Sequence, residues 1–333
     1  MAVVFDERWM GLHGIGRFAT ELSRRLTLQN LGLPRSPSHP LDCVAMSASM
    51  LRRPRDVFFS PGYNAPVLAL SRYVFVVHDL NHIDVDANSN VLKRLYYRFV
   101  LKRACRNALG LLTVSEFTAR RIAAWANVPR ERIHVVGNGV SAAFSTQGDT
   151  HAEGCDYFLV VGNRKDHKNE ARVIAAFAAL AANRKNVRLV LTGMPSTALQ
   201  IAIDRCALGD AVRFTGALSD AELAAYYRGA VGLVFPSLYE GFGLPVVEAM
   251  SCGTPVITST TTSLPEVAGG AALLVDPLST EAIAAAMARL LDEPLLRQEL
   301  GRLGLAQARQ FSWDVVSNRV ELLLQKFRSK VAP

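Results

Sequence analysis

The sequence predicts an α/β protein with two domains, each built on a doubly wound parallel sheet. Its 333 residues are long for one domain and sufficient for two domains that each bury a core. Apolar strand-like runs alternate with helical segments and short turns, most regularly over residues 157–275, as in parallel sheets whose strands are connected by helices. A polar run over residues 145–156 reads as the linker. We therefore expect a first domain over residues 1–150, a second over 151–312 and a final helix within 313–333.

The first half of the chain alternates apolar runs with helical segments. The predicted strands are Val3–Phe5, Cys43–Met46, Val57–Phe59, Tyr73–Val77 and Leu109–Val114. The predicted helices cover residues 17–29, 90–108 and 115–126. Ligands of such sheets bind at the loops that follow parallel strands, so His78, directly after Tyr73–Val77, is a candidate site residue. A histidine at this place is also common as a satisfied core residue.

The second half repeats the pattern with shorter connections. The predicted strands are Tyr157–Val161, Val187–Thr192, Val212–Gly216, Val231–Phe235, Pro255–Thr258 and Leu273–Val275. The predicted helices cover residues 171–182, 197–207, 219–229, 279–291, 294–310 and 313–330, with one more short helix after the fourth strand.

Residues 235–256 carry the clearest functional signal. A strand ends at Phe235, a loop with Gly241 and Gly243 follows, and Pro245 lies in the first turn of a short helix, where its missing N–H needs no partner. Glycines before a helix start let a ligand approach the backbone N–H groups closely. Because a helix N-terminus carries about half a positive charge, this loop favours a phosphate or diphosphate.

Two carboxylates lie beside this predicted anion site. Glu240 is in the loop, and Glu248 lies four residues beyond Leu244, on the same side of the helix. A carboxylate repels a phosphate but accepts hydrogen bonds from two neighbouring hydroxyl groups. The combination therefore predicts a ligand with both a phosphate and a sugar.

This stretch resembles the E-x7-E signature of the family-four retaining glycosyltransferases. The matching residues are Glu240, Gly241, Phe242, Gly243, Pro245, Glu248 and Ala249. The resemblance implies two Rossmann-like domains that face a cleft, the GT-B architecture, with the last helix returning to the first domain. It also implies a metal-independent enzyme that uses a nucleoside-diphosphate sugar and no other cofactor.

The resemblance also implies roles for single residues. In the family, the first glutamate and the backbone N–H groups after it contact the transferred sugar, here Glu240 and residues 241–244, and the second glutamate binds the ribose, here Glu248. Gly16 is similar in place to a glycine near the donor phosphate or acceptor, and His78 to a histidine near the donor sugar. Lys168 matches a lysine on the diphosphate.

One position departs from the family pattern. Relatives commonly have an arginine directly after the glycine that ends the first strand of the second domain, and here Asn163 follows Gly162. Arg164 or Lys165 is the candidate to replace that arginine on the diphosphate.

The composition limits the other possibilities. All of the net charge of +8 lies in residues 1–150, where Lys93, Arg94, Arg98, Lys102, Arg103 and Arg106 share one predicted helix with three aromatic residues. Such a helix is typical of contact with an anionic membrane surface, and an ordinary solvated face explains it equally well. We expect no nucleic-acid partner, because no base-reading motif accompanies the charge. Five widely spaced cysteines without a CxxC pair favour a reducing compartment and argue against zinc.

We expect a cytoplasmic protein, peripheral at most on the inner face of the membrane, since no apolar run is long enough to span a bilayer and no signal peptide is recognisable. Asp84-Val85-Asp86 imitates a D-x-D metal site, but such pairs in polar loops are usually solvated. The resemblance to bacterial O-antigen and exopolysaccharide mannosyl- or rhamnosyltransferases implies GDP-mannose or a deoxyhexose nucleotide as donor, with mannose favoured, and a glycan or lipid-linked saccharide as acceptor.

Other functions stay open at this point. A sugar-nucleotide epimerase or hydrolase of the same architecture would need no acceptor. A nicotinamide oxidoreductase would use Gly14, Gly16 and Ala19, which have dinucleotide-site spacing, although eight residues separate Phe5 from Gly14 and the tight turn of such sites is lost. A catalytically silent scaffold is the third alternative.

Overall fold

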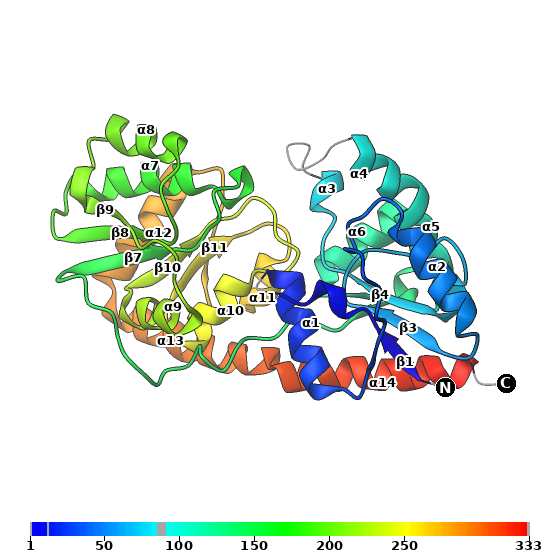
Figure 1. The fold of residues 1–333 in the computed structure, drawn as a ribbon. Coiled ribbons are helices and arrows are strands. Elements are labelled where there is room, and N and C mark those ends of the chain that lie inside the picture. The colour runs from blue at the N-terminus through cyan, green and yellow to red at the C-terminus, as the bar shows by residue number, and fades with distance from the viewer. Residues whose placement is uncertain (1, 12, 85–90, 332–333) are drawn as a thin grey trace. The chain divides into compact units, whose positions relative to one another are not determined.

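The computed structural model describes residues 2–11, 13–84 and 91–331 (Figure 1). It divides into two compact units. Unit 1 comprises residues 1–139 together with 313–333, and unit 2 comprises residues 140–312. The division therefore falls at Gly139, before the predicted position near residue 150. The last helix is grouped with unit 1.

Unit 1 contains a parallel sheet with the strand order β2-β1-β3-β4-β5-β6. The strands are β1 Val3–Phe5, β2 Gln29–Asn30, β3 Val57–Ser60, β4 Tyr73–Val77, β5 Gly110–Thr113 and β6 Ile133–Val135. The α-helices are α1 Gly14–Arg25, α2 Asp42–Arg52, α3 Asn81–Asp84, α4 Val91–Tyr96, α5 Lys102–Asn107, α6 Glu116–Ala126 and α14 Trp313–Val331.

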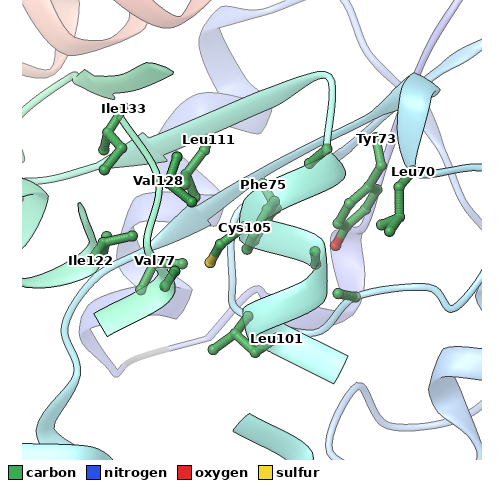
Figure 2. Packing of buried hydrophobic residues seen from close by; sticks show 14 of the residues in the cluster. Leu70, Tyr73, Phe75, Val77, Leu101, Cys105, Leu111, Ile122, Val128 and Ile133 are labelled. Atoms are coloured by element: carbon green, nitrogen blue, oxygen red, sulfur yellow. The ribbon is translucent and has the colours of Figure 1, made fainter. Parts of the chain in front are cut away.

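Helices cover both faces of this sheet, which explains why its central strands are apolar on both sides. On one face, side chains of α2, α5 and α6 join the core, and Figure 2 shows Phe75 and Val77 of β4 and Leu111 of β5 beside Leu101 and Cys105. On the other face α14 packs against α1 and β3. Its Phe327 ring lies so close to Gly110 of β5 that a Cβ there would be 2.4 Å from the ring.

Unit 2 contains a second parallel sheet, with the order β12-β11-β10-β7-β8-β9. The strands are β7 Asp156–Val160, β8 Val187–Leu191, β9 Val212–Phe214, β10 Gly232–Phe235, β11 Val256–Ser259 and β12 Leu273–Val275. The α-helices are α7 Glu170–Ala181, α8 Thr197–Arg205, α9 Asp220–Gly229, α10 Leu244–Ser251, α11 Leu264–Ala268, α12 Thr280–Asp292 and α13 Pro294–Ala308. Helices α7, α8 and α12 share one core, and α9 and α10 pack together outside it.

The predicted doubly wound α/β fold is confirmed by these two parallel sheets, but three predicted elements of unit 1 differ. The predicted strand Cys43–Met46 is wrong, because these residues begin helix α2, whose buried side includes Met46 and Met50. The predicted helix over 17–29 begins at Gly14 and ends at Arg25, where the next residues lead into β2. The predicted helix over 90–108 is interrupted by a π-helical turn, Tyr97–Leu101, which buries Tyr97 and Leu101. Residue 90 lies outside the described part.

Candidate functional site

The candidate site of unit 2 lies at the carboxyl ends of β7 and β10. These strands are neighbours, and the chain leaves them in opposite directions, through β8 to β9 on one side and through β11 to β12 on the other. In open α/β sheets, ligands bind in the crevice at such a switch point. The loop after β7 carries Lys168, and the loop after β10 carries Glu240.

The structure brings Lys168 and Glu240 together. The Lys168 Nζ atom donates to Glu240 Oε1 at 2.7 Å, and each side chain is 14% exposed. The same ammonium lies 5.0 Å from the centroid of the Phe235 ring, at the end of β10. A cation and a carboxylate that are both largely removed from water form a strongly coupled pair, so the charge of Lys168 is positioned by its surroundings.

Buried hydroxyl groups fix the loop that carries Glu240. Ser263 Oγ donates to the carbonyl oxygens of Glu240 at 2.9 Å and Phe242 at 2.8 Å. Ser237 Oγ donates to the His167 carbonyl at 2.8 Å, which ties the loop after β10 to the loop after β7. Ser259 Oγ in turn donates to the Ser237 carbonyl at 2.6 Å. No local motif indicated these serines, although Ser259 ends β11 and Ser263 lies in the loop after it, and such loops often carry functional residues.

Gly243 makes the start of α10 possible. Its φ is +108°, and an added Cβ would lie 2.6 Å from Leu264 Cδ2, so a larger residue would be strained and crowded. No side chain caps this helix at Gly243, and Pro245 occupies the first turn. Phe242 is buried and packs edge-on against Phe311, with ring centroids 5.4 Å apart. A helix start without a side-chain cap leaves its first N–H groups to other partners, and the predicted anion contact of residues 241–244 stays a prediction.

Glu248 lies on α10 and is 5% exposed. Its Oε2 atom accepts a hydrogen bond of 3.1 Å from the hydroxyl group of Tyr227 on α9. The sequence motif predicted Glu248 as a site residue but did not indicate its contact with Tyr227, because no local spacing links residues of two different helices. The predicted ribose contact of Glu248 stays a prediction.

The loop after β7 carries Arg164, one of the two candidates to replace the arginine that relatives have at the position of Asn163. Arg164 has a left-handed backbone with φ of 66°. Its guanidinium pairs with Glu170, donates to the carbonyl oxygens of Thr192 and Met194, and lies 5.3 Å from the Phe214 ring centroid. These contacts engage the Arg164 side chain, whereas Asn163 and Lys165 are exposed, and the diphosphate contact of Arg164 or Lys165 stays a prediction. Burial raises the pKa of Glu170, and the adjacent Arg164 opposes that effect.

The two predicted site residues of unit 1 lie near the carboxyl ends of its strands. Gly16 is in the first turn of α1, and its N–H donates to Nδ1 of His13 at 3.0 Å, so the His13 side chain caps this helix. An added Cβ at Gly16 would lie 2.6 Å from the Gly11 carbonyl oxygen. Close backbone packing therefore already explains why this residue is glycine. Gly14, in contrast, has open space around it.

His78 is a partly exposed residue directly after β4. Its Nε2 donates to the Pro61 carbonyl oxygen at 2.8 Å, and its ring meets Phe18 edge-on at 5.0 Å. Burial lowers the pKa of His78 to about 4, so the ring is neutral at pH 7. With Nε2 as the donor, Nδ1 is the acceptor nitrogen. A neutral ring with one donor and one acceptor nitrogen suits His78 to hydrogen bonding, and its place near the donor sugar stays a prediction.

The metal-like motif and the dinucleotide-like spacing have structural explanations in the described residues. Asp84 pairs with Arg121 of α6, whereas Val85 and Asp86 lie outside the described residues. Between β1 and α1 the chain forms a short 3-10 helix, Glu7–Trp9, so the tight strand-to-helix turn of a dinucleotide site is not formed. In residues 2–11, 13–84 and 91–331, no three histidine, cysteine or acidic side chains gather as metal ligands.

Comparison with known proteins identifies the family. Residues 12–144 match Glycosyltransferase Family 4, and residues 145–306 match Glycosyl transferases group 1. The O-antigen chain mannosyltransferase B of Escherichia coli is 31% identical over 273 residues, which are 78% of this chain and 71% of that protein. The chain belongs to the family 4 glycosyltransferases. As a member of this family, it is an enzyme that transfers glycosyl groups.

Two further relatives of the glycosyltransferase are mannosyltransferases by name. The MMP alpha-(1->4)-mannosyltransferase of Mycolicibacterium hassiacum is 34% identical over 72% of this chain and 60% of its own length. The O-antigen chain mannosyltransferase RfbU of Salmonella typhimurium is 33% identical over 62% of this chain and 58% of its own length. The chain thus spans less than two thirds of each of these two proteins.

Solved structures support the GT-B architecture of the glycosyltransferase. WaaG, a glycosyltransferase involved in lipopolysaccharide biosynthesis, matches this chain with a TM-score of 0.76 at 15% identity. The match covers 97% of this chain and 99% of WaaG. HepE of Anabaena in complex with UDP-glucose gives the same TM-score, identity and coverage.

No helix among the residues that the structure describes is long and apolar enough to cross a membrane.

Proposed function

We propose that this glycosyltransferase moves a mannosyl group from GDP-mannose to a glycan or lipid-linked saccharide, with retention of configuration, in the synthesis of a surface polysaccharide. The observation that carries the proposal is the Lys168–Glu240 pair of 2.7 Å at the switch point of unit 2, next to the start of α10. The mannosyltransferase names of the curated relatives support the choice of sugar.

The chemistry follows from the charges. As the bond between the sugar C1 and the diphosphate oxygen breaks, negative charge grows on the departing diphosphate. An ammonium at about 4 Å stabilises such a charge by about 4 kcal/mol at surface-like dielectric, whereas a helix N-terminus contributes about 0.3 to 2 kcal/mol. Lys168 is thus the main counter-charge, with α10 in a secondary role, and Glu240 accepts hydrogen bonds from sugar hydroxyl groups.

Retention is proposed to proceed without a covalent enzyme intermediate, because the sequence offers no evident nucleophile. The new bond between the acceptor oxygen and C1 forms on the face that the diphosphate leaves. The proton of the acceptor hydroxyl passes to an oxygen of the departing phosphate. The protein's part is to hold both substrates in place, and no metal ion takes part in this proposal.

Nucleotide binding tests the donor class. In thermal unfolding with GDP, UDP, dTDP or NAD, we expect GDP alone to raise the Tm, because a ligand at one hundred times its Kd adds about 2.7 kcal/mol to the stability of the folded state. The shift should persist in EDTA. A shift with UDP or dTDP alone would change the donor and keep the class, and a shift with NAD alone would contradict the proposed class.

We also propose that the protein works at the inner face of the cytoplasmic membrane, through α4 and the π-helical turn. Leu92 is 75% exposed and Phe99 62% exposed, and the exposed cations Lys93, Arg94 and Arg98 lie among them. Apolar side chains beside cations suit the surface of an anionic bilayer.

Vesicle co-sedimentation tests this contact. Binding should rise with the anionic lipid content and fall in the double variant Arg98→Glu/Phe99→Ala, because both the charge attraction and the apolar insertion are weakened. Arg205→Glu, on α8 of unit 2, is the control for charge reversal and should bind like the wild type. Binding that does not depend on anionic lipid would contradict the proposed contact.

A further inference from the structure

Tyr227 is a fully buried residue of unit 2 whose hydroxyl group contacts the candidate site from a neighbouring helix. It lies in the last turn of α9, which packs against α10, the helix that carries Glu248 (Figure 1). The hydroxyl group donates to Glu248 Oε2 at 3.1 Å. A buried tyrosine hydroxyl needs an acceptor, and the acceptor here is a carboxylate that the sequence predicts as a ligand-binding group.

The fold places the Tyr227 hydroxyl before any ligand arrives. The Tyr227 carbonyl oxygen accepts a hydrogen bond of 2.6 Å from Thr254 Oγ1, in the turn after α10, and Thr254 is itself buried. The ring packs edge-on against Phe144, with centroids 5.9 Å apart. Because contacts hold both the main chain and the ring of Tyr227, its hydroxyl group has a fixed position relative to α10.

A fixed donor selects one orientation of the Glu248 side chain. Glutamate has three side-chain torsions, so its carboxylate has many positions unless a contact holds it. A hydrogen bond to a carboxylate is stronger than one between neutral groups. Since Glu248 is 5% exposed, loss of the Tyr227 hydroxyl would leave a buried carboxylate with one partner fewer, which is unfavourable.

The oriented carboxylate fits a pair of neighbouring hydroxyl groups. It has about four acceptor positions, of which Tyr227 uses one. The ribose of a nucleoside diphosphate has such a pair, at its 2′ and 3′ carbons. We propose that Tyr227 is a positioning residue for the donor nucleotide, which holds the Glu248 carboxylate in the orientation that accepts hydrogen bonds from the ribose hydroxyl groups. This inference rests on the proposed function and adds the residue that aligns the ribose contact.

The proposal differs from a role in packing alone. A tyrosine between α9 and α10 also fills space, and that role depends on its ring. Positioning of Glu248 depends on the hydroxyl group and affects only ligands that carry ribose hydroxyl groups. Tyr227→Phe keeps the ring and removes the hydroxyl group, so this variant separates the two roles when ligands with and without ribose hydroxyl groups are compared.

Isothermal titration calorimetry with GDP and 2′,3′-dideoxy-GDP tests the proposal. The wild type should bind GDP about tenfold more tightly, because the dideoxy compound leaves the site carboxylate short of partners. Tyr227→Phe should weaken GDP by about five- to tenfold and the dideoxy compound by less than about twofold, so that the preference for GDP is largely lost.

Two further variants control the comparison. Tyr226→Phe removes a hydroxyl group from the preceding residue of α9, whose ring stacks on His151 at 3.8 Å, and should keep the wild-type preference. Glu248→Ala should lose the preference, and adding Tyr227→Phe to it should not change the ratio of the two Kd values further, because the hydroxyl acts through Glu248.

Initial rates give an independent measurement. The ribose is remote from the bond that breaks, so its contacts are the same in the ground state and the transition state. Tyr227→Phe should therefore raise the KM for the nucleotide-sugar donor and leave kcat at saturating donor unchanged. A fall in kcat with an unchanged KM would contradict a role in positioning the ribose contact.

The proposal is overturned if Tyr227→Phe weakens GDP and its dideoxy analogue equally, if it weakens neither, or if Tyr226→Phe has the same effect. It is also overturned if the wild type binds the two compounds equally well. If the nucleotide panel selects UDP, the same comparison uses UDP and its dideoxy analogue. A wild type that binds no nucleotide contradicts the proposed function itself, whereas GDP binding with an unchanged preference in Tyr227→Phe keeps the donor assignment and loses this inference.

Discussion

Lys168→Ala is expected to lower the turnover of the glycosyltransferase by about 10²- to 10³-fold, the loss typical of removing one preorganised group that stabilises transition-state charge. The ammonium is partly buried and already aligned by Glu240 at 2.7 Å, so its charge reaches the diphosphate with little reorganisation. Initial rates with saturating donor measure the effect. Lys185→Ala, which removes an exposed lysine of the same unit, is the control and should retain wild-type turnover.

A double-mutant cycle with Glu240→Gln shows how far the two residues act together. If the pair acts as a unit, the double variant should lose far less than the sum of the two single losses. Wild-type turnover in Lys168→Ala would remove the lysine from the mechanism. Additive losses would keep both residues but assign them separate roles.

Arg8→Leu is expected to destabilise unit 1 by about 3 to 5 kcal/mol, as is usual when one partner of a buried ion pair is removed. The Arg8 guanidinium donates to Asp6 Oδ1 at 2.6 Å and to Asp42 Oδ1 at 2.5 Å, and these carboxylate side chains are only 2% and 3% exposed. Without Arg8, two buried carboxylates face each other without a counter-charge. Urea unfolding followed by circular dichroism measures the loss.

The control for this variant is Arg24→Leu, because Arg24 also pairs with a carboxylate but its side chain is 69% exposed. Exposed pairs contribute about 0 to 1 kcal/mol. Equal losses for Arg8→Leu and Arg24→Leu would mean that the buried cluster is no more important than a surface pair.

The structural features that the sequence predicted well are those that a single local pattern of residues determines. Alternating apolar strands and helices predicted the two parallel sheets, and the glycines around Phe242 predicted the start of α10. The family resemblance predicted Lys168 and Glu240 as residues of one donor site, but their direct contact is seen only in the structure, where β7 and β10 are adjacent.

Features that depend on tertiary contacts were not predictable in this way. Residues 43–46 have strand-like side chains, but burial of Met46 and Met50 on one side makes them helical. Arg164 was a candidate for the diphosphate contact in the sequence, and its contact with Thr192, 28 residues away, comes from the folded structure. A pocket of unit 1 likewise combines residues from 37–43, 63–64, 82 and 92–97, which no single motif connects.

The division of the chain has a consequence for synthesis on the ribosome. Unit 2 is one continuous segment, residues 140–312, whereas unit 1 needs α14, which is made after all of unit 2. Until α14 emerges, Gly110 and the neighbouring sheet face lack the Phe327 ring that covers them. The nascent first unit therefore keeps an apolar face uncovered while the second unit is completed.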